Sequence, residues 1–502
     1  MSEMEPIEED NKEEIKNFKK DRAKTQVLIN TANIIDNADG QLLPALYTPI
    51  QNDLGFSLGD LGGITAARSL LQAITTPLWG WLSDKYSRKI ILAIGCFIWG
   101  IATIVMGVIN NLVGFYFIRS FIGIGLAVIV PTSQSLIADY FHESKRGVAF
   151  GYLGLTGVLG AIFGTLYATI IGDMTILGIA GWRFSFITVG SLSIVLGILI
   201  WLFGKDPIRG TSEDEIGKLV NKSTEKKYSM KFKDIKKILT NKTFIVIVLQ
   251  GVTGSIPWNS ILFVIYWFEH IGFDSLLAGI AFSVIAIGAA LGNLFGGFLG
   301  DWAAKKNANY GRILVAQISV FLGIPMMFII FLAIPRVATT TNLVLFIVVG
   351  LITGFMISWC APAANNPIFS ELFEPEMRST AYSIDRLFEG AIAASGTLIV
   401  AGLAVWAFGF QNPPEGGTIA DLSPTVIASN IDAIAWAMII ATCIPWFLCM
   451  IFYTFAYFTY PKDRDNAKKV LLQRQQELMS QDTFGEENLE KDDETKSKKE
   501  NT

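Results

Sequence analysis

Twelve runs of mostly apolar residues, each long enough to cross a bilayer as a helix of about 20 residues, dominate the sequence. Three charged segments, 1–24, 205–242 and 461–502, hold 51 of the 84 Asp, Glu, Lys and Arg residues, so the other 398 residues carry only 33. A soluble core of that size needs far more polar surface. The pattern excludes a soluble enzyme and predicts an all-α integral membrane protein with twelve transmembrane helices. The predicted spans run approximately over 25–50, 60–83, 90–109, 112–140, 146–171, 182–204, 242–269, 275–299, 311–335, 341–370, 376–409 and 427–458.

The charged segment 205–242 divides these spans into two sets of six. We therefore predict an N-terminal half at 25–204 and a C-terminal half at 243–460, joined by this segment as a cytoplasmic linker. Both ends, 1–24 and 461–502, are highly charged and are predicted to be disordered tails that aid solubility, with a regulatory role as the alternative. The acidic start lacks the basic region of a cleavable signal peptide, so the first span is expected to remain as a helix.

Lysine and arginine are concentrated in the loops that follow even-numbered spans. Segment 205–242 alone holds eleven of them, whereas the loops after odd-numbered spans hold only Arg183 and Arg336. Because short cytoplasmic loops carry the excess of positive charge, both termini and the middle segment are predicted to be cytoplasmic. The shorter even-numbered loops contribute Lys85, Arg88, Lys89, Lys145, Arg146, Lys305, Lys306, Arg312 and Arg378.

Cysteine and histidine are sparse. All four cysteines lie in apolar spans without paired-ligand spacing, and the two histidines, His142 and His270, are far apart in the sequence. The chain has no G-x-x-x-x-G-K-[ST] run and hence no nucleotide-binding loop of its own to drive transport. We expect no metal, no cofactor, no nucleic-acid partner and a monomer in the lipid bilayer.

The two halves repeat a loop motif. GWLSDKYSRK, from Gly80, ends the second span, and GFLGDWAAKK, from Gly297, ends the eighth span at an offset of 217. A second match, at an offset of 232, pairs IADYFHESKR, which follows Pro131, with FSELFEPEMR, which follows Pro362. Two matches in the same order indicate that the halves share one topology.

The repeated loops predict a breakable ion-pair network, or gate, at the cytoplasmic edge. Glycine lets another helix approach closely, and a carboxylate is favoured near the N-terminus of a neighbouring helix. The alternative is a basic loop that only sets the orientation of the chain in the membrane. The predicted gate residues are Gly80, Asp84, Arg88, Asp139, Arg146, Asp301, Glu371 and Arg378.

The loop after the second span resembles the signature G-x-L-x-D-x-x-G-R-[RK] of the major facilitator superfamily. The chain departs from it at Ser87, where the family usually has Gly. In the second loop it departs at Lys305, where the family's signature has Arg. Arg119, followed by Gly123 and Gly125, is similar to the family's next marker. The resemblance implies two pseudo-symmetric six-helix halves, alternating access, and a central cavity lined by the first, fourth, seventh and tenth spans.

Longer stretches are similar to the Spinster-type branch of this superfamily and to uncharacterised plant members. They are RSFIGIGLAVIVPTSQSLIADYF from Arg119, RGVAFG from Arg146, GWRFSF from Gly181, ADGQLLP from Ala38, QGVTGSIPW from Gln250 and APAANNPIF from Ala361. The resemblance implies a carrier of lipid-related solutes such as lysophospholipids and sphingoid phosphates. That branch commonly has Glu directly after the second glycine of the fourth span, where this chain has Leu126.

Charged residues inside the spans are costly, so each is a functional hypothesis. Asp36 and Asp39 lie in the first span, with Asn33 on the same helix face as Asp36, while Arg68 lies in the second span and Arg119 in the fourth. At 1.5 Å per residue, Asp36 and Arg68 are expected to meet near mid-depth. A carboxylate beside an arginine can switch between paired and protonated states, so this pair is predicted to couple protons and Arg119 to attract an anionic group. The alternative is that the pairs only hold helices together.

Polar and aromatic groups in three spans of the second half complete the predicted site. Prolines interrupt the spans at 242–269 and 341–370, which is tolerated where a wet cavity satisfies the backbone. Asp385, Arg386 and Glu389 open the span at 376–409, and packing roles for the two tryptophans are as plausible as contact with a solute. The predicted contacts are Gln250, Trp258, Asn259, Trp359, Asn365 and Asn366, with Glu389 as a second coupling candidate.

The combined prediction is a secondary active carrier of a small organic or amphipathic solute. Two arginines, two aspartates, amides and tryptophan suit a zwitterionic or amphipathic molecule such as a lysolipid, and equally an organic anion. Two alternatives from other classes are a lipid scramblase or channel and a ligand sensor that does not transport. Counterflow between trapped and external ligand separates a scramblase or channel from a carrier. A sensor is expected to have longer tails than the 42 residues at the C-terminus.

Overall fold

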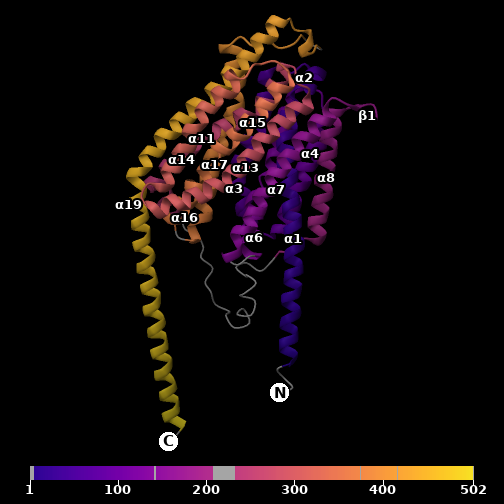
Figure 1. Ribbon diagram of the computed structural model, residues 1–502. Coiled ribbons are helices and arrows are strands. Elements are labelled where there is room, and N and C mark those ends of the chain that lie inside the picture. The colour runs from indigo at the N-terminus through magenta and orange to yellow at the C-terminus, as the bar shows by residue number, and fades with distance from the viewer. Residues whose placement is uncertain (1–4, 141–142, 207–231, 374, 415–416, 501–502) are drawn as a thin grey trace.

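The computed structural model describes residues 5–140, 143–206, 232–373, 375–414 and 417–500. Two helical bundles lie side by side, one from each half of the chain, and both termini lie at the same end of the molecule (Figure 1). We call this the terminal end and the other the far end. Helix α2, Tyr47–Leu54, lies at the far end.

The first bundle contains the long helices of the N-terminal half and one short hairpin. Its helices are α1 (Glu5–Ala45), α2, α3 (Leu58–Lys85), α4 (Arg88–Met106), α5 (Leu112–Leu126), α6 (Ile129–Tyr140), α7 (Glu143–Gly172) and α8 (Gly181–Phe203). Strands β1 (Thr175–Ile176) and β2 (Ile179–Ala180) pair antiparallel between α7 and α8.

The second bundle is also built from long helices, but short η segments interrupt several of them. Its elements are α10 (Phe232–Thr240), α11 (Lys242–Ser260), η1 (Ile261–Phe263), α12 (Val264–Ile271), α13 (Ser275–Lys306), α14 (Gly311–Phe328), η2 (Ile329–Ala333), α15 (Thr340–Ile357), η3 (Ala361–Asn365), α16 (Asn366–Leu372), α17 (Pro375–Ala393), α18 (Ser395–Gly402), η4 (Leu403–Ala407), η5 (Ile419–Asp421) and α19 (Pro424–Glu500). The proline-containing spans 242–269 and 341–370 are both broken, at η1 and η3, because proline removes a helical hydrogen bond.

Polar residues begin many of these helices. Ser57 accepts a hydrogen bond from the Asp60 N–H, and the Asp60 carboxylate accepts one from the Ser57 N–H, which together form a capping box at the start of α3. Asn111, Asn241 and Asp274 cap α5, α11 and α13, each with its side-chain oxygen accepting from the backbone N–H three residues on. These caps satisfy backbone N–H groups that the apolar helix ends leave unpaired.

Ten of the described helical segments are long and apolar enough to cross a membrane. Helices α1 and α3 fall outside this set, and they are the two that hold Asp36, Asp39 and Arg68. The surface is correspondingly apolar, since Phe298 and Trp406 are largely exposed to the surroundings. A soluble surface rarely presents such a broad apolar face, and the prediction of an all-α membrane protein is confirmed.

The two halves make matching contacts. A Cβ built on Gly80 would lie 3.9 Å from the Pro131 side chain, and one built on Gly297 would lie 3.7 Å from the Pro362 side chain. The first match of the repeat aligns the two glycines, and the two prolines precede its second match. The same close approach therefore recurs in both bundles, as the shared topology predicts.

The described parts of the charged ends differ from the prediction of disorder. Helix α1 begins at Glu5, and α19 continues from its membrane span to Glu500. Both ends are rich in Glu and Lys, which favour helix when it extends an existing one. Residues 207–231 of the predicted linker lie outside the described residues, and the division into halves, linker and tails otherwise stays a prediction.

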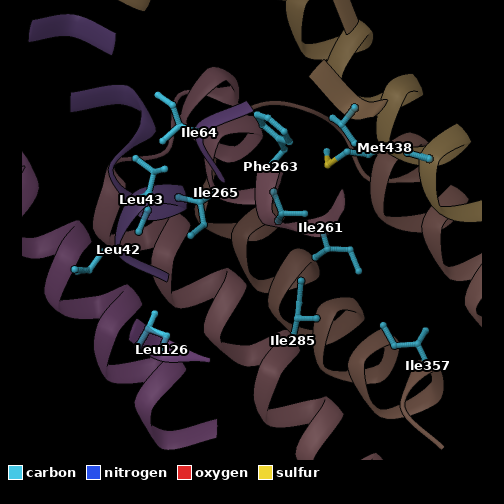
Figure 2. Packing of buried hydrophobic residues seen from close by; sticks show 14 of the residues in the cluster. Leu42, Leu43, Ile64, Leu126, Ile261, Phe263, Ile265, Ile285, Ile357 and Met438 are labelled. Carbon is cyan, nitrogen blue, oxygen red and sulfur yellow. The ribbon is translucent and has the colours of Figure 1, made fainter. Parts of the chain in front are cut away.

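Apolar residues from both halves pack together toward the far end. Leu43 and Ile64 of the first half lie close to Phe263 and Ile265 of the second half (Figure 2), and all four are buried in one continuous core. The two bundles therefore close on each other at this end.

Candidate functional site

Four charged residues on α1, α3 and α5 form a continuous chain of ion pairs. Arg68 Nη2 lies 3.3 Å from Asp36 Oδ1, and Arg68 Nε lies 3.5 Å from Asp39 Oδ2. Arg119 Nη1 donates to the same Asp39 oxygen at 3.2 Å, and its Nη2 donates to the Asp39 carbonyl at 3.3 Å. We call Asp36, Arg68, Asp39 and Arg119 the ion-pair chain.

Burial explains why the ion-pair chain has equal numbers of acids and bases. Asp39 and Arg119 are completely buried, and Thr103 also donates to Asp39, at 3.4 Å. An isolated charge at this depth is very costly, whereas a paired and hydrogen-bonded charge is tolerated. The predicted meeting of Asp36 and Arg68 is present, and the structure adds that Asp39 joins the two arginines.

A cavity of about 280 Å³ lies against the ion-pair chain, and we call it the ion-pair cavity. Its first-half wall includes Asp36, Arg68 and Arg119, and its second-half wall includes Trp258 and Asn259 of α11. Gln41 and Gln72, which the sequence did not single out, also line it. A solute in this cavity would contact both halves at once.

A second cavity, of about 180 Å³, lies within the second half against α17, and we call it the α17 cavity. Its lining comes from α11, α13, α14, α15, η3, α16, α17 and α19. Among the predicted residues, the lining includes Gln250, Trp258, Asn365, Asn366 and Glu389. Trp258 is 43% exposed and lines both cavities, so its side chain lies between them.

The acids of α17 are buried but not equally paired. Arg386 Nη1 donates to Glu389 Oε2 at 3.3 Å, whereas Asp385 Oδ1 has no hydrogen-bond partner among the described residues. Asp385 and Glu389 are 4% and 7% exposed, and both line the α17 cavity. One carboxyl oxygen of the cavity therefore lacks a hydrogen-bond partner among the described residues.

Two predicted contacts lie away from both cavities. Asn33 donates to the Leu153 carbonyl at 2.6 Å and to Thr156 at 3.2 Å, so it attaches α1 to α7. Trp359 is buried against Phe295 and Phe355, with ring centroids 5.3 and 5.9 Å away. In the structure both side chains pack against neighbouring helices of the same half.

The predicted gate is only partly described, because the side chains of Asp84, Asp139, Arg146 and Arg378 lie outside the described residues. In the first half Arg88 Nε lies 2.8 Å from Asp206 Oδ1. In the second half Arg312 lies 2.9 Å from Asp301 and 3.3 Å from Glu371, which also accepts a hydrogen bond from Tyr460. Arg312 was not among the predicted gate residues, and the available signal was its place in a basic loop.

The far end is closed by hydrogen bonds between the halves, none of which the sequence predicted. Thr48 donates to Glu269, and Tyr266 donates to Gln51 Oε1 at 2.6 Å. Thr397 donates to the Gly62 carbonyl at 2.9 Å. The one available signal was Glu269, an acid at the end of an otherwise apolar span.

Comparisons with known proteins agree with this architecture. The sequence profile of the Major Facilitator Superfamily matches residues 31–397. The probable L-galactonate transporter of Escherichia coli strain K12 is 23% identical over 66% of this chain and 73% of that protein. Protein spinster of Drosophila melanogaster is 23% identical over 79% of this chain and 65% of that protein.

Among solved structures, a bacterial homologue of the human lysosomal transporter Spinster, inward-facing and unoccupied, superimposes with a TM-score of 0.73. It is 19% identical, and the match covers 88% of this chain and 98% of that one. The predicted resemblance to the superfamily and its Spinster-type members is confirmed. The chain is a multi-pass membrane protein of the Major Facilitator Superfamily and, like the other members of this family of carriers, a secondary transporter.

Proposed function

We propose that the protein carries a small organic or amphipathic solute by alternating access, with the solute bound in the ion-pair cavity. The observation that carries the proposal is the composition of this cavity, in which charged residues of the first half face Trp258 and Asn259 of the second. A solute held by both halves favours the conformation in which they close around it, and closure at alternate ends moves the solute across the bilayer.

Arg68 and Arg119 favour a solute with an anionic group. Both line the cavity while sharing Asp39, so an incoming anion can take over part of the hydrogen bonding that Asp39 supplies. A relative named for L-galactonate supports an organic acid, and the resemblance to the Spinster-type branch implies a lysolipid-like solute. Both share the anionic group, and a lysolipid adds an apolar chain.

Proton coupling is proposed for Asp36. Its carboxylate lines the cavity and pairs with Arg68 at one end of the ion-pair chain, where it has fewer partners than Asp39. When a solute anion binds Arg68, the carboxylate loses its counter-charge and protonation becomes favourable. The positive charge of the even-numbered loops supports a cytoplasmic position for both termini, and we propose a monomer.

Counterflow in proteoliposomes tests the proposal. Vesicles are loaded with millimolar L-galactonate or lysophosphatidylcholine, and uptake of trace labelled compound is followed at pH 5.5 and 7.5. A carrier gives transient, saturable accumulation, which the Asp36→Asn variant makes independent of pH. The exposed Asp421→Asn variant, remote from both cavities, serves as the control.

Two results would contradict the carrier. Non-saturable flux without accumulation favours a channel or scramblase. Specific binding of one probe to the purified protein, without counterflow of that probe, favours a sensor.

A further inference from the structure

The α17 cavity keeps a buried carboxylate oxygen without a partner. Asp385 is 4% exposed, its Oδ1 makes no hydrogen bond among the described residues, and the side chain lines the cavity. A buried charged oxygen is costly unless it is paired. The position is therefore suited to a group that arrives with its own positive charge.

Two polar side chains of this cavity already donate to backbone carbonyls. Gln250 Nε2 donates to the Ile247 carbonyl at 2.8 Å, and the Ser255 hydroxyl donates to the Gly251 carbonyl at 2.6 Å. Arg386, which lines the cavity but is 62% exposed, is engaged by Glu389. The described lining therefore contains two acidic side chains and one basic side chain.

Trp258 adds a second feature that selects a cation. Its half-exposed ring is a wall of the α17 cavity. Indole rings attract ammonium groups through their negative face, and the attraction grows when water is excluded. A carboxylate and an indole together bind an ammonium group more strongly than they bind an anion or a neutral group.

We propose that the α17 cavity is a binding subsite for a positively charged ammonium group, with Asp385 as its counter-ion. The ammonium subsite rests on the proposed function, and it narrows the class of solute to a zwitterion or a lipid with a cationic headgroup. Its anionic group would bind Arg68 and Arg119 on one side of Trp258, and its ammonium group would bind Asp385 on the other side.

Three soluble probes separate the two cavities: choline for the ammonium group, glycerol phosphate for the anion, and glycerophosphocholine for both. The melting temperature of the purified full chain is measured in neutral detergent against each probe, with sodium chloride at equal ionic strength as the reference. A ligand that binds only the folded state raises this temperature. We expect choline to raise it by about 3 °C near saturation.

Asp385→Asn is expected to raise the apparent Kd for choline at least tenfold, while glycerol phosphate binds as before. Without ligand this variant should melt no lower than the parent, because it removes an unpaired buried charge. Asp385→Glu should retain choline binding, and the exposed Asp421→Asn variant should match the parent.

Two outcomes would overturn the subsite. One is an unchanged choline response in Asp385→Asn, and the other is no choline response in the parent at any pH from 6 to 8, as expected if Asp385 holds a proton instead. A failure of glycerol phosphate alone would count against the anion site of the proposed function and leave the ammonium subsite supported.

Discussion

Within the ion-pair chain, Asp39 makes contacts that Asp36 does not make. Asp39 contacts both arginines, whereas Asp36 contacts Arg68. Removing Asp39 would leave Arg119 fully buried without a carboxylate, and the cost of such a charge exceeds that of losing an exposed pair. We therefore expect the two aspartates to divide their roles, with Asp39 holding the helices together and Asp36 exchanging the proton of the proposed coupling.

Asp39→Asn is expected to destabilise the protein by about 3–5 kcal/mol, because it breaks a buried pair from one side. Asp36→Asn should cost clearly less, since Arg68 keeps Asp39 as a partner. Melting temperatures of the two variants in one detergent measure the difference. Equal losses would contradict the division of roles, and partial recovery in Asp39→Asn with Arg119→Gln would support it.

The pairing of Asp36 with Arg68 was predictable from the sequence because depth can be counted along a helix. The number of residues from each end of the span places Asp36 and Arg68 at one level, and the structure pairs them. Counting gives height but not the direction in which a side chain points. That direction depends on packing, which is why Asn33 faces α7 and Trp359 faces Phe295 rather than a cavity.

At the scale of elements, close helix contacts depend on particular glycines. Helix α7 contacts α1 along one face, where a Cβ on Gly164 would meet the Ala38 backbone. On the same helix, a Cβ on Gly154 would meet nothing within 4 Å. The spans themselves were predictable from apolar length, but the choice of contact face was not, because both glycines look alike in the sequence.

The Gly154→Ala and Gly164→Ala variants should therefore behave oppositely. Alanine at position 154 is expected to be neutral or to stabilise by up to about 1 kcal/mol, through its better helix propensity. Alanine at 164 must push α1 away from α7 and is expected to cost about 1–3 kcal/mol. Thermal unfolding of both variants checks the sign, and similar values for the two would show that α1 and α7 do not pack as described.

At the scale of the whole molecule, each polar contact between the halves is weak enough to break. The far end is closed by neutral and singly charged hydrogen bonds, Thr48 to Glu269 and Tyr266 to Gln51, beside an apolar core. Each such bond contributes only about 0.5–1.5 kcal/mol net. A few bonds of this size hold one conformation without locking it, which alternating access requires.

The variant Thr48→Val combined with Tyr266→Phe should open the far end, because it removes both donors while keeping the side-chain shapes. Loss of two bonds shifts the equilibrium between conformations about tenfold. Spin labels at the exposed Leu177 and Val337, in far-end loops of different halves, report the separation as a distance distribution. A longer distance should gain population in the double variant and not in Thr340→Val, an exposed threonine of the same end. An unchanged distribution would mean that the apolar contacts around Phe263 close this end by themselves. Labelled solute would then leave the parent and the double variant at the same rate.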